Sequence, residues 1–177
     1  PAVAESAVVA SPDEMRGTIV KAILITHCHM DHILGHREIK EATEAPVWVH
    51  PSEADRLPLS PDFLFEHNSQ VVFGKVNFTT IHVPGHTTGG MSLLWGYHLF
   101  SGDTLFPNGP GATTSPENFQ ELVHNLKERT FALPDQVAVH PGHGADTILG
   151  REKEQFSIFS QRSHRLDLCG DVQWLRD

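Results

Sequence analysis

Four residues able to bind a metal ion occur within six consecutive positions of the sequence. Three are imidazoles, His27, His29 and His32, and the fourth is the carboxylate of Asp31. Imidazole and carboxylate are ligands of zinc and of non-haem iron, and open catalytic sites use them, whereas closed structural zinc sites commonly use paired cysteines. The two cysteines of the sequence lie far apart, so this stretch predicts an open metal centre.

The spacing of these residues predicts how they divide between ions. In an extended stretch, side chains two positions apart point the same way, so His27 and His29 can bind one ion together. Asp31 and His32 follow after the chain has begun to turn, and they can face a second ion beside the first. Thirteen histidines in 177 residues also favour metal binding.

The element that must position this loop is the preceding run 19–25, which is apolar, rich in β-branched residues and predicted to be a buried strand. Functional side chains are often presented by loops at the end of a strand. The pattern beyond the loop predicts the following elements in order: a helix over 33–44, a strand over 46–50, a helical turn over 52–57 and an irregular loop over 58–65.

The rest of the chain predicts further strands that end in loops bearing ligand-type residues. These loops carry His86, Asp103 and His143. The predicted elements are a hairpin of 71–73 with 76–83, a hairpin of 91–95 with 98–101, a long flexible loop over 107–115, a helix over 116–130, a strand over 137–140, a helix over 148–162 and a polar tail. Residues 1–18 are predicted to be a short helix or tail with a turn at 11–14.

Length, charge and hydropathy restrict the class of protein. A chain of 177 residues fits a single domain, 1–177. The net charge is 13 − 22 = −9, which disfavours nucleic acid and anionic membrane surfaces as partners and leaves a small-molecule substrate. No apolar run is long enough to cross a bilayer, and the N-terminus has no signal-peptide pattern, so we expect a cytoplasmic protein without a disulfide framework.

Four motifs in this order resemble the metallo-β-lactamase-fold hydrolase superfamily, and within it glyoxalase II, the hydroxyacylglutathione hydrolase. They are His-x-His-x-Asp-His at 27–32, Gly-His-Thr at 85–87, Ser-Gly-Asp-Thr-Leu-Phe at 101–106 and Pro-Gly-His-Gly at 141–144. The resemblance covers roughly residues 19–155 and implies an α/β (α+β) fold, the αββα sandwich. Because such folds begin with several strands ahead of the first motif, we expect part of the N-terminal sheet to be lacking, so that the domain is N-terminally incomplete.

The resemblance also implies a ligand set and two zinc ions per chain, with iron or manganese as alternatives. It assigns His27, His29 and His86 to the first ion. It assigns Asp31, His32 and His143 to the second ion, with Asp103 bridging the two. An aspartate in the bridging position argues against antibiotic hydrolysis as the native activity.

The chemistry expected of such a site is hydrolysis of a thioester or another activated acyl bond. Two adjacent cations lower the pKa of a shared water, so that hydroxide can attack a carbonyl carbon while one ion stabilises the oxyanion. Asp31 is the expected catalytic residue, because its carboxylate can orient the hydroxide or accept its proton. Glyoxalase II has a C-terminal helical domain that helps bind glutathione, but only 177 − 143 = 34 residues follow His143, which leaves the thiol part of the substrate open.

We expect the substrate pocket to draw on the loop 57–66 and on residues 106–114, with Phe106 and Asn108 as substrate-binding residues. Cys28 is expected to point away from the ions. The remaining histidines are interpreted as surface or packing residues.

Other functions remain compatible with the sequence. Within the same fold they are an iron-dependent persulfide dioxygenase-like enzyme with one metal, a lactonase and a phosphodiesterase. A non-catalytic binding module that uses metal only for folding is a further alternative. The sequence leaves the oligomeric state open.

Overall fold

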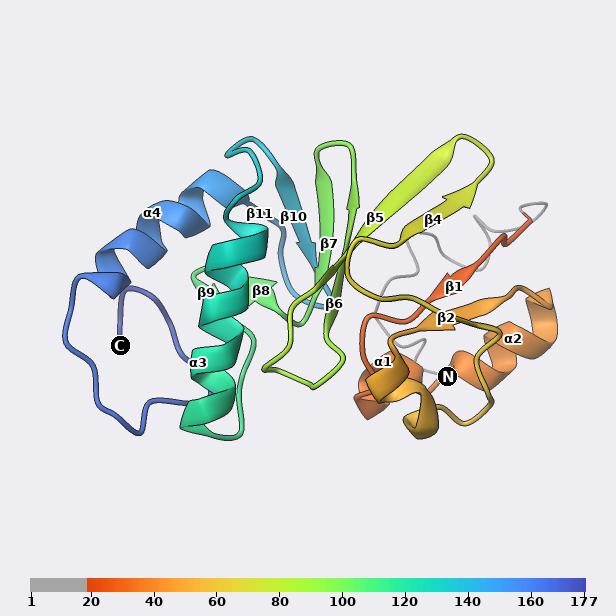
Figure 1. The fold of residues 1–177 in the computed structure, drawn as a ribbon, viewed down its shortest axis with the longest axis horizontal. Helices are drawn as coiled ribbons and strands as arrows, with labels where there is room; N and C mark the ends of the chain where they lie inside the picture. Colours follow the sequence, from red (N-terminus) through yellow and green to blue (C-terminus); the bar gives the residue numbers. More distant parts are fainter. Residues whose placement is uncertain (1–18) are drawn as a thin grey trace.

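The computed structural model describes residues 19–177, so the helix or tail predicted for 1–18, with its turn at 11–14, lies outside the described residues. Two β-sheets pack face to face, and each carries helices on its outer side (Figure 1). The described chain therefore has the layer order helix, sheet, sheet, helix, and the predicted αββα architecture is confirmed.

The first sheet consists of three short parallel strands in the order β1-β2-β3. Helical connections join them, as the crossover between parallel strands requires. In chain order the elements are β1 (Ile23–Leu24), α1 (Met30–Ile33), α2 (His36–Thr43), β2 (Val47–Val49), the 3-10 helix η1 (Pro51–Arg56) and β3 (Phe63–Leu64).

Three predictions for this region need correction. The predicted strand 19–25 is limited to the two residues of β1. The helix predicted over 33–44 is α2, which begins later, at His36, after Gly35 with a ψ of 2°, and the separate short helix α1 precedes it within the metal-ligand segment. The loop 58–65, predicted to be irregular, contains β3, which pairs with β2 through Trp48 and Phe63. A strand of two residues is too short to give a recognisable alternating pattern.

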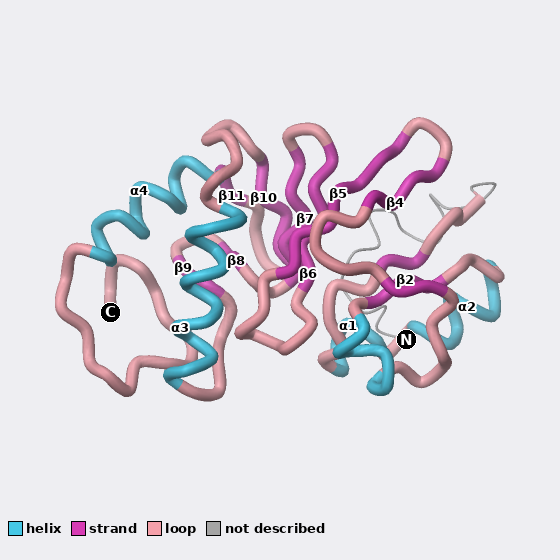
Figure 2. Tube along the Cα trace, in the orientation of Figure 1, coloured by secondary structure: helices cyan, strands magenta, loops and turns pink. Residues whose placement is uncertain are grey.

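The second sheet has six strands in the order β11-β10-β7-β6-β5-β4 (Figure 2). The four strands β4 to β7 form an antiparallel meander that contains both predicted hairpins. β10 runs parallel to β7 and β11 is antiparallel to β10. The strands are β4 (Gln70–Phe73), β5 (Val76–His82), β6 (Met91–Trp95), β7 (His98–Gly102), β10 (Ala138–Pro141) and β11 (Thr147–Ile148).

The segment predicted to be a long flexible loop, 107–115, is ordered in the structure. It holds β9 (Gly109–Pro110), which pairs with β8 (Leu105–Phe106) in a small hairpin. Gly109 is buried, and a Cβ atom there would overlap the carbonyl oxygen of Val172. Glycine thus permits the close approach of the C-terminal segment to this hairpin.

Two helices cover the outer face of the second sheet (Figure 1). α3 (Pro116–Asn125) begins at Ser115, whose Oγ accepts a hydrogen bond from Asn118 N–H, and it continues into a π-helical turn, η2 (Leu126–Thr130). α4 (Leu149–Ser160) starts directly after β11 and ends two residues before the predicted end at 162. No helix within residues 19–177 is long and apolar enough to span a bilayer.

The largest core lies between the second sheet and α3 and α4, and it includes side chains from the end of the chain. Val172 and Trp174 are buried in it beside Leu122 and Leu149. The prediction of a polar tail is therefore wrong, because two apolar residues alternating with polar ones were enough to fix this segment. Smaller clusters pack under the first sheet, around Val47, and between the two sheets.

Candidate metal centre

The seven residues predicted to bind metal come from four segments, each following a strand, and the structure brings these segments together. The segment after β1 carries four of them, His27 and His29 in its loop and Asp31 and His32 in α1, and the loops after β5, β7 and β10 carry one residue each. The side chains that meet are His27, His29, Asp31, His32, His86, Asp103 and His143.

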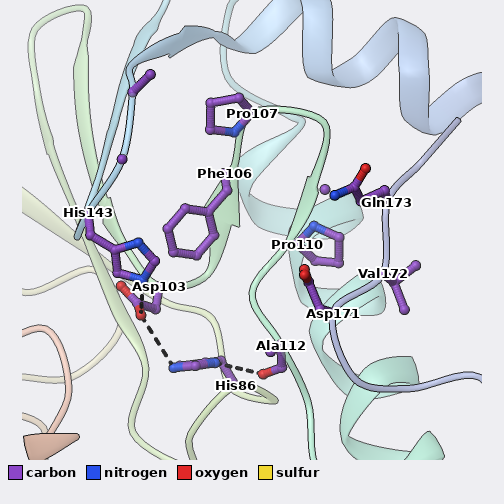
Figure 3. Close-up of a pocket in the computed structure, with 13 residues that line it drawn as sticks. His86, Asp103, Phe106, Pro107, Pro110, Ala112, His143, Asp171, Val172 and Gln173 are labelled. Atoms are coloured by element: carbon purple, nitrogen blue, oxygen red, sulfur yellow. Dashed lines mark hydrogen bonds and ion pairs between the residues drawn. The ribbon is translucent and has the colours of Figure 1, made fainter. Parts of the chain in front are cut away.

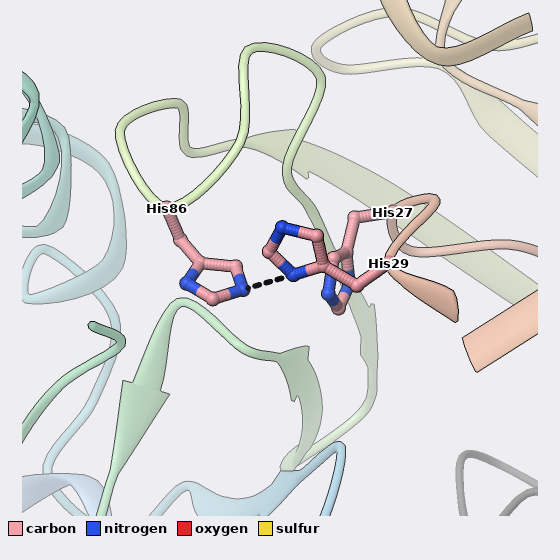
Figure 4. Close-up of side chains that lie close together, drawn as sticks. All are labelled: His27, His29 and His86. Atoms are coloured by element: carbon pink, nitrogen blue, oxygen red, sulfur yellow. Dashed lines mark hydrogen bonds between the residues drawn. The ribbon is translucent and has the colours of Figure 1, made fainter. Parts of the chain in front are cut away.

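His27, His29 and His86 form one group of potential ligands (Figure 4). His86 Nε2 lies 2.9 Å from His29 Nδ1. The ring centroid of His27 is 4.8 Å from that of His29 and 5.0 Å from that of His86. These are the three residues that the family resemblance assigns to the first ion.

The tautomer of His86 is fixed by the backbone. Its Nδ1 lies 2.7 Å from the carbonyl oxygen of Ala112, so Nδ1 carries the proton and donates it. The lone pair is then on Nε2, the atom that faces His29. A histidine that ligates a metal typically donates its other ring N–H in this way, which sets the orientation of the ring.

Asp103 lies at the centre of the remaining contacts. Its Oδ1 is 3.3 Å from His32 Nε2, and its Oδ2 is 3.2 Å from His143 Nε2 and 3.9 Å from His27 Nε2. Asp31 Oδ2 reaches to 3.6 Å from His32 Nε2 at the exposed side of the site. Asp103 thus touches ligand residues from both predicted sets, which is the position expected of a bridging ligand.

The burial of this cluster favours a bound cation. His27 is 1% exposed and Asp103 is 5% exposed. Three buried atoms of this cluster have no hydrogen-bond partner among residues 19–177: His27 Nε2, His32 Nε2 and Asp103 Oδ1. A buried polar atom without a partner destabilises the fold by about 1–3 kcal/mol, so three such atoms converging on one place require compensation. The residues present therefore fit divalent metal ions with nitrogen and oxygen ligands.

The protonation states of the buried groups suit ligation. Burial, and then the neighbouring ring of His32, lower the pKa of His27 to about 2, so this imidazole is neutral at physiological pH. Burial raises the pKa of Asp103, but its interactions with His32 and His27 outweigh this and bring the pKa down to about 2. Neutral imidazole and ionised carboxylate are the forms that bind metal.

One residue that sequence reasoning missed holds two ligand loops together. The buried carboxylate of Glu53, from η1, accepts hydrogen bonds from the backbone N–H groups of Cys28 and Gly89. Cys28 itself points away from the ligand cluster, since its Sγ donates to the carbonyl oxygen of Glu53. Burial and the nearby Glu53 raise the pKa of Cys28 to about 12, so this thiol is no nucleophile. Only the burial of Glu53 distinguishes it, and burial is not visible in the sequence.

A cavity of about 460 Å³ adjoins the ligand cluster. His86, Asp103 and His143 form one end, and Phe106 lies against His143 with ring centroids 4.6 Å apart (Figure 3). The opposite wall is the C-terminal segment 171–173, which sequence reasoning assigned to a tail. Among the described residues, the loop 57–66 lines no part of this cavity, contrary to expectation.

The two residues predicted to contact substrate differ in their placement. Phe106 lines the cavity. Asn108 does not: its Oδ1 accepts hydrogen bonds from Arg151 and Gln155, and its backbone N–H donates to Glu152. We therefore leave Asn108 out of the candidate substrate site.

Comparisons with known proteins agree with this geometry. The chain is 27% identical over 165 residues to the hydroxyacylglutathione hydrolase GloC of Haemophilus influenzae, covering 81% of this chain and 78% of that protein. Among solved structures, the BLEG-1 B3 metallo-β-lactamase superposes with a TM-score of 0.72 at 25% identity, covering 78% of this chain and 77% of that one. A di-iron-bound form of TTHA1623 has a TM-score of 0.66 at 31% identity, covering 81% and 83%. The family model described as the metallo-β-lactamase superfamily matches residues 17–143, and the chain belongs to that superfamily.

Proposed function

We propose that this protein is a dinuclear zinc hydrolase that cleaves a thioester or another activated acyl bond of a small molecule. The observation that carries the proposal is the pair of potential ligand groups that share His27, one completed by His29 and His86 and the other by His32 and Asp103. Both groups lie at the end of a cavity large enough for a small substrate.

The roles of the side chains follow from their environments. Two divalent ions held here would supply the positive charge that acidifies water and polarises a carbonyl group. Asp103, buried among the imidazoles, holds the two ligand groups together. Asp31 has a side chain that is 67% exposed and lies beside His32, so its carboxylate can accept a proton from the attacking water and pass it to solvent.

Two observations favour this reaction over the alternatives. His32 and His143 both contact Asp103, and a centre with a single metal ion would not need both. The Haemophilus influenzae relative is named for hydrolysis of a hydroxyacyl thioester. The di-iron form of a structural neighbour makes iron the competing metal, and elemental analysis decides between the two.

The test combines metal content with turnover. Protein purified without added metal is analysed for zinc, iron and manganese, and is then assayed with S-lactoylglutathione and with the neutral thioester S-lactoyl-N-acetylcysteamine. We expect about two zinc ions per chain and hydrolysis of at least one thioester. His86→Ala should lose metal and activity, whereas His124→Ala, at an exposed position of α3, should lose neither.

Two other outcomes would contradict the proposed hydrolase, and each points to a different function. One iron per chain without thioester cleavage points to oxidative chemistry. Full metal loading and a raised melting temperature without turnover of any acyl substrate point to a metal-stabilised binding module.

We also propose that the protein acts in a reducing compartment, the cytoplasm. The two cysteines, Cys28 and Cys169, are free in the structure. Fractionation of cells that produce the native protein tests this placement.

A further inference from the structure

We propose that the cavity beside the metal centre selects acyl substrates by charge, and that Asp171 is the residue that determines this specificity. The part of the substrate that fills the cavity would be neutral or cationic, and an anionic group would be disfavoured. This inference rests on the proposed function, since it names the class of substrate for the same site.

The C-terminal segment places Asp171 in the cavity wall, where this residue is exposed to solvent. Gly170, just before it, exchanges two backbone hydrogen bonds with Thr113, at 3.1 and 2.9 Å. Val172, just after it, is buried in the main core. Trp174 N–H donates to the carbonyl oxygen of Asn108 at 2.8 Å. The backbone on both sides of Asp171 is thus anchored, so its position is set before any substrate arrives.

The carboxylate of Asp171 has no partner within the described chain. It makes no hydrogen bond or ion pair with another described residue, and Figure 3 shows it beside Pro110, across the cavity from Phe106 and His143. The described residues that line the cavity include no lysine or arginine, and Gln173 is the other polar side chain on this wall. A carboxylate in the wall of a cavity, with no lysine or arginine among the described lining residues to pair with it, favours a cation or a hydrogen-bond donor on the ligand.

The two ends of the cavity therefore differ in chemistry. One end holds His86, Asp103 and His143, where the carbonyl group of a substrate would react. Phe106, Pro107 and Pro110 make part of the wall apolar, and Asp171 lies beside Pro110, across the cavity from His143 (Figure 3). A matching substrate has a reactive acyl group, a short apolar stretch and a neutral or ammonium-bearing end. A glutathione thioester carries two carboxylates and one ammonium group, and because its net charge is negative it matches this wall poorly.

Binding of three non-hydrolysable ketones tests the inference without requiring turnover. They are methyl ketones with the same alkyl chain, ending in a trimethylammonium, a hydroxyl or a carboxylate group. Calorimetry on zinc-loaded protein at low salt should give a Kd about fivefold lower for the cation than for the neutral ketone, and about fivefold higher for the anion.

Substitutions of Asp171 test whether this residue causes the differences in Kd among the three ketones. Asp171→Asn should remove the difference between the cationic and neutral ketones, and Asp171→Lys should invert the order. Glu154→Gln and Glu154→Lys make the same charge changes on an exposed position of α4 and should leave the order unchanged. Equal Kd values for the three ketones, no measurable binding of any of them, or an order unaffected by Asp171 would each overturn the inference. If S-lactoyl-N-acetylcysteamine is not hydrolysed while the charge order holds, the proposed reaction fails and the charge selectivity stands.

Discussion

The carboxylate of Glu53 binds the backbone of Gly89, whose N–H donates a hydrogen bond to Oε1 at 3.0 Å. The second oxygen, Oε2, accepts the N–H of Cys28 at 3.2 Å. Glu53 is fully buried, and through these two bonds it joins the loop of His27 to the loop of His86. A carboxylate outside the ligand cluster thus links two loops that carry metal ligands, in the way that outer residues position the ligands of many metal sites.

We predict that Glu53→Gln weakens zinc binding about tenfold, in line with the effect of removing outer partners of metal ligands. The glutamine amide has one acceptor oxygen, so one of the two N–H groups loses its partner and the two loops separate. Competition with a chromophoric chelator measures the zinc affinity. Glu41→Gln, on the exposed side of α2, is the matched control and should bind zinc as the wild type does. Unchanged zinc affinity in Glu53→Gln would show that the loops hold their positions without it.

A second prediction concerns the backbone close to Asp103. A Cβ atom at Gly142 would overlap Asp103 Oδ1 and lie 2.6 Å from His32 Cε1. We expect Gly142→Ala to displace these ligands and to reduce the metal content from about two ions per chain to about one, because His29 and His86 are untouched. Elemental analysis after dialysis measures the stoichiometry.

The control for that change is Gly35→Ala. Its added Cβ atom meets only Ile39 Cδ1, at an ordinary contact distance of 3.6 Å. Gly35→Ala should keep full metal content. Two ions per chain in Gly142→Ala would mean that the loop of His143 can move to make room for a methyl group.

The metal centre could be predicted from the sequence because its ligands occur either close together in the chain or directly after predictable strands. His27 to His32 lie together, and the other ligands follow strands with clear apolar patterns, so the family and the sandwich fold were predicted and are confirmed. Glu53 could not be predicted, because its partners are 25 and 36 positions away and the contact depends on how η1 packs.

The cavity wall shows a second limit of sequence reasoning. Phe106, the last residue of the ligand motif at 101–106, was predicted to line the pocket and does so. Asp171 lies near the end of the chain, in a segment whose apolar residues, Val172 and Trp174, are too few to predict a strand or a helix. The packing of Val172 and Trp174 into the main core and the backbone pairing of Gly170 with Thr113 bring Asp171 to the cavity.

Glu152 leads to a prediction about pH. This buried carboxyl group accepts hydrogen bonds from Thr147 Oγ1 and from Asn108 N–H. Burial nevertheless raises the pKa of Glu152 above its ordinary value of 4.5. Above pH 4.5 the folded state therefore holds more protons on this group than the unfolded chain does, and its contribution to stability declines as the pH rises through the folded pKa.

We expect the glutamine in Glu152→Gln, which does not titrate, to contribute equally to stability at each pH. The amide oxygen can accept the N–H of Asn108, and the amide nitrogen can donate to the hydroxyl of Thr147, which rotates to accept. The free energy of unfolding of the variant, relative to wild type, should increase between pH 4.5 and neutral pH. Urea denaturation of both metal-free proteins measures this difference. Glu154→Gln, on the same helix but exposed, should show no such trend, and a pH-independent difference for Glu152→Gln would contradict the prediction.

The burial of Trp174 predicts that truncating its side chain strongly lowers the free energy of unfolding. The indole is 0% exposed and packs against Phe156 and Phe159, with ring centroids 5.2 and 5.1 Å away. We expect Trp174→Ala to lower the free energy of unfolding by about 3–5 kcal/mol, measured by urea denaturation. Leu175→Ala, next in the chain but half exposed, should lower it by less than about 1 kcal/mol. Equal effects of the two substitutions would mean that the C-terminal segment contributes no core and that Asp171 lacks a rigid support.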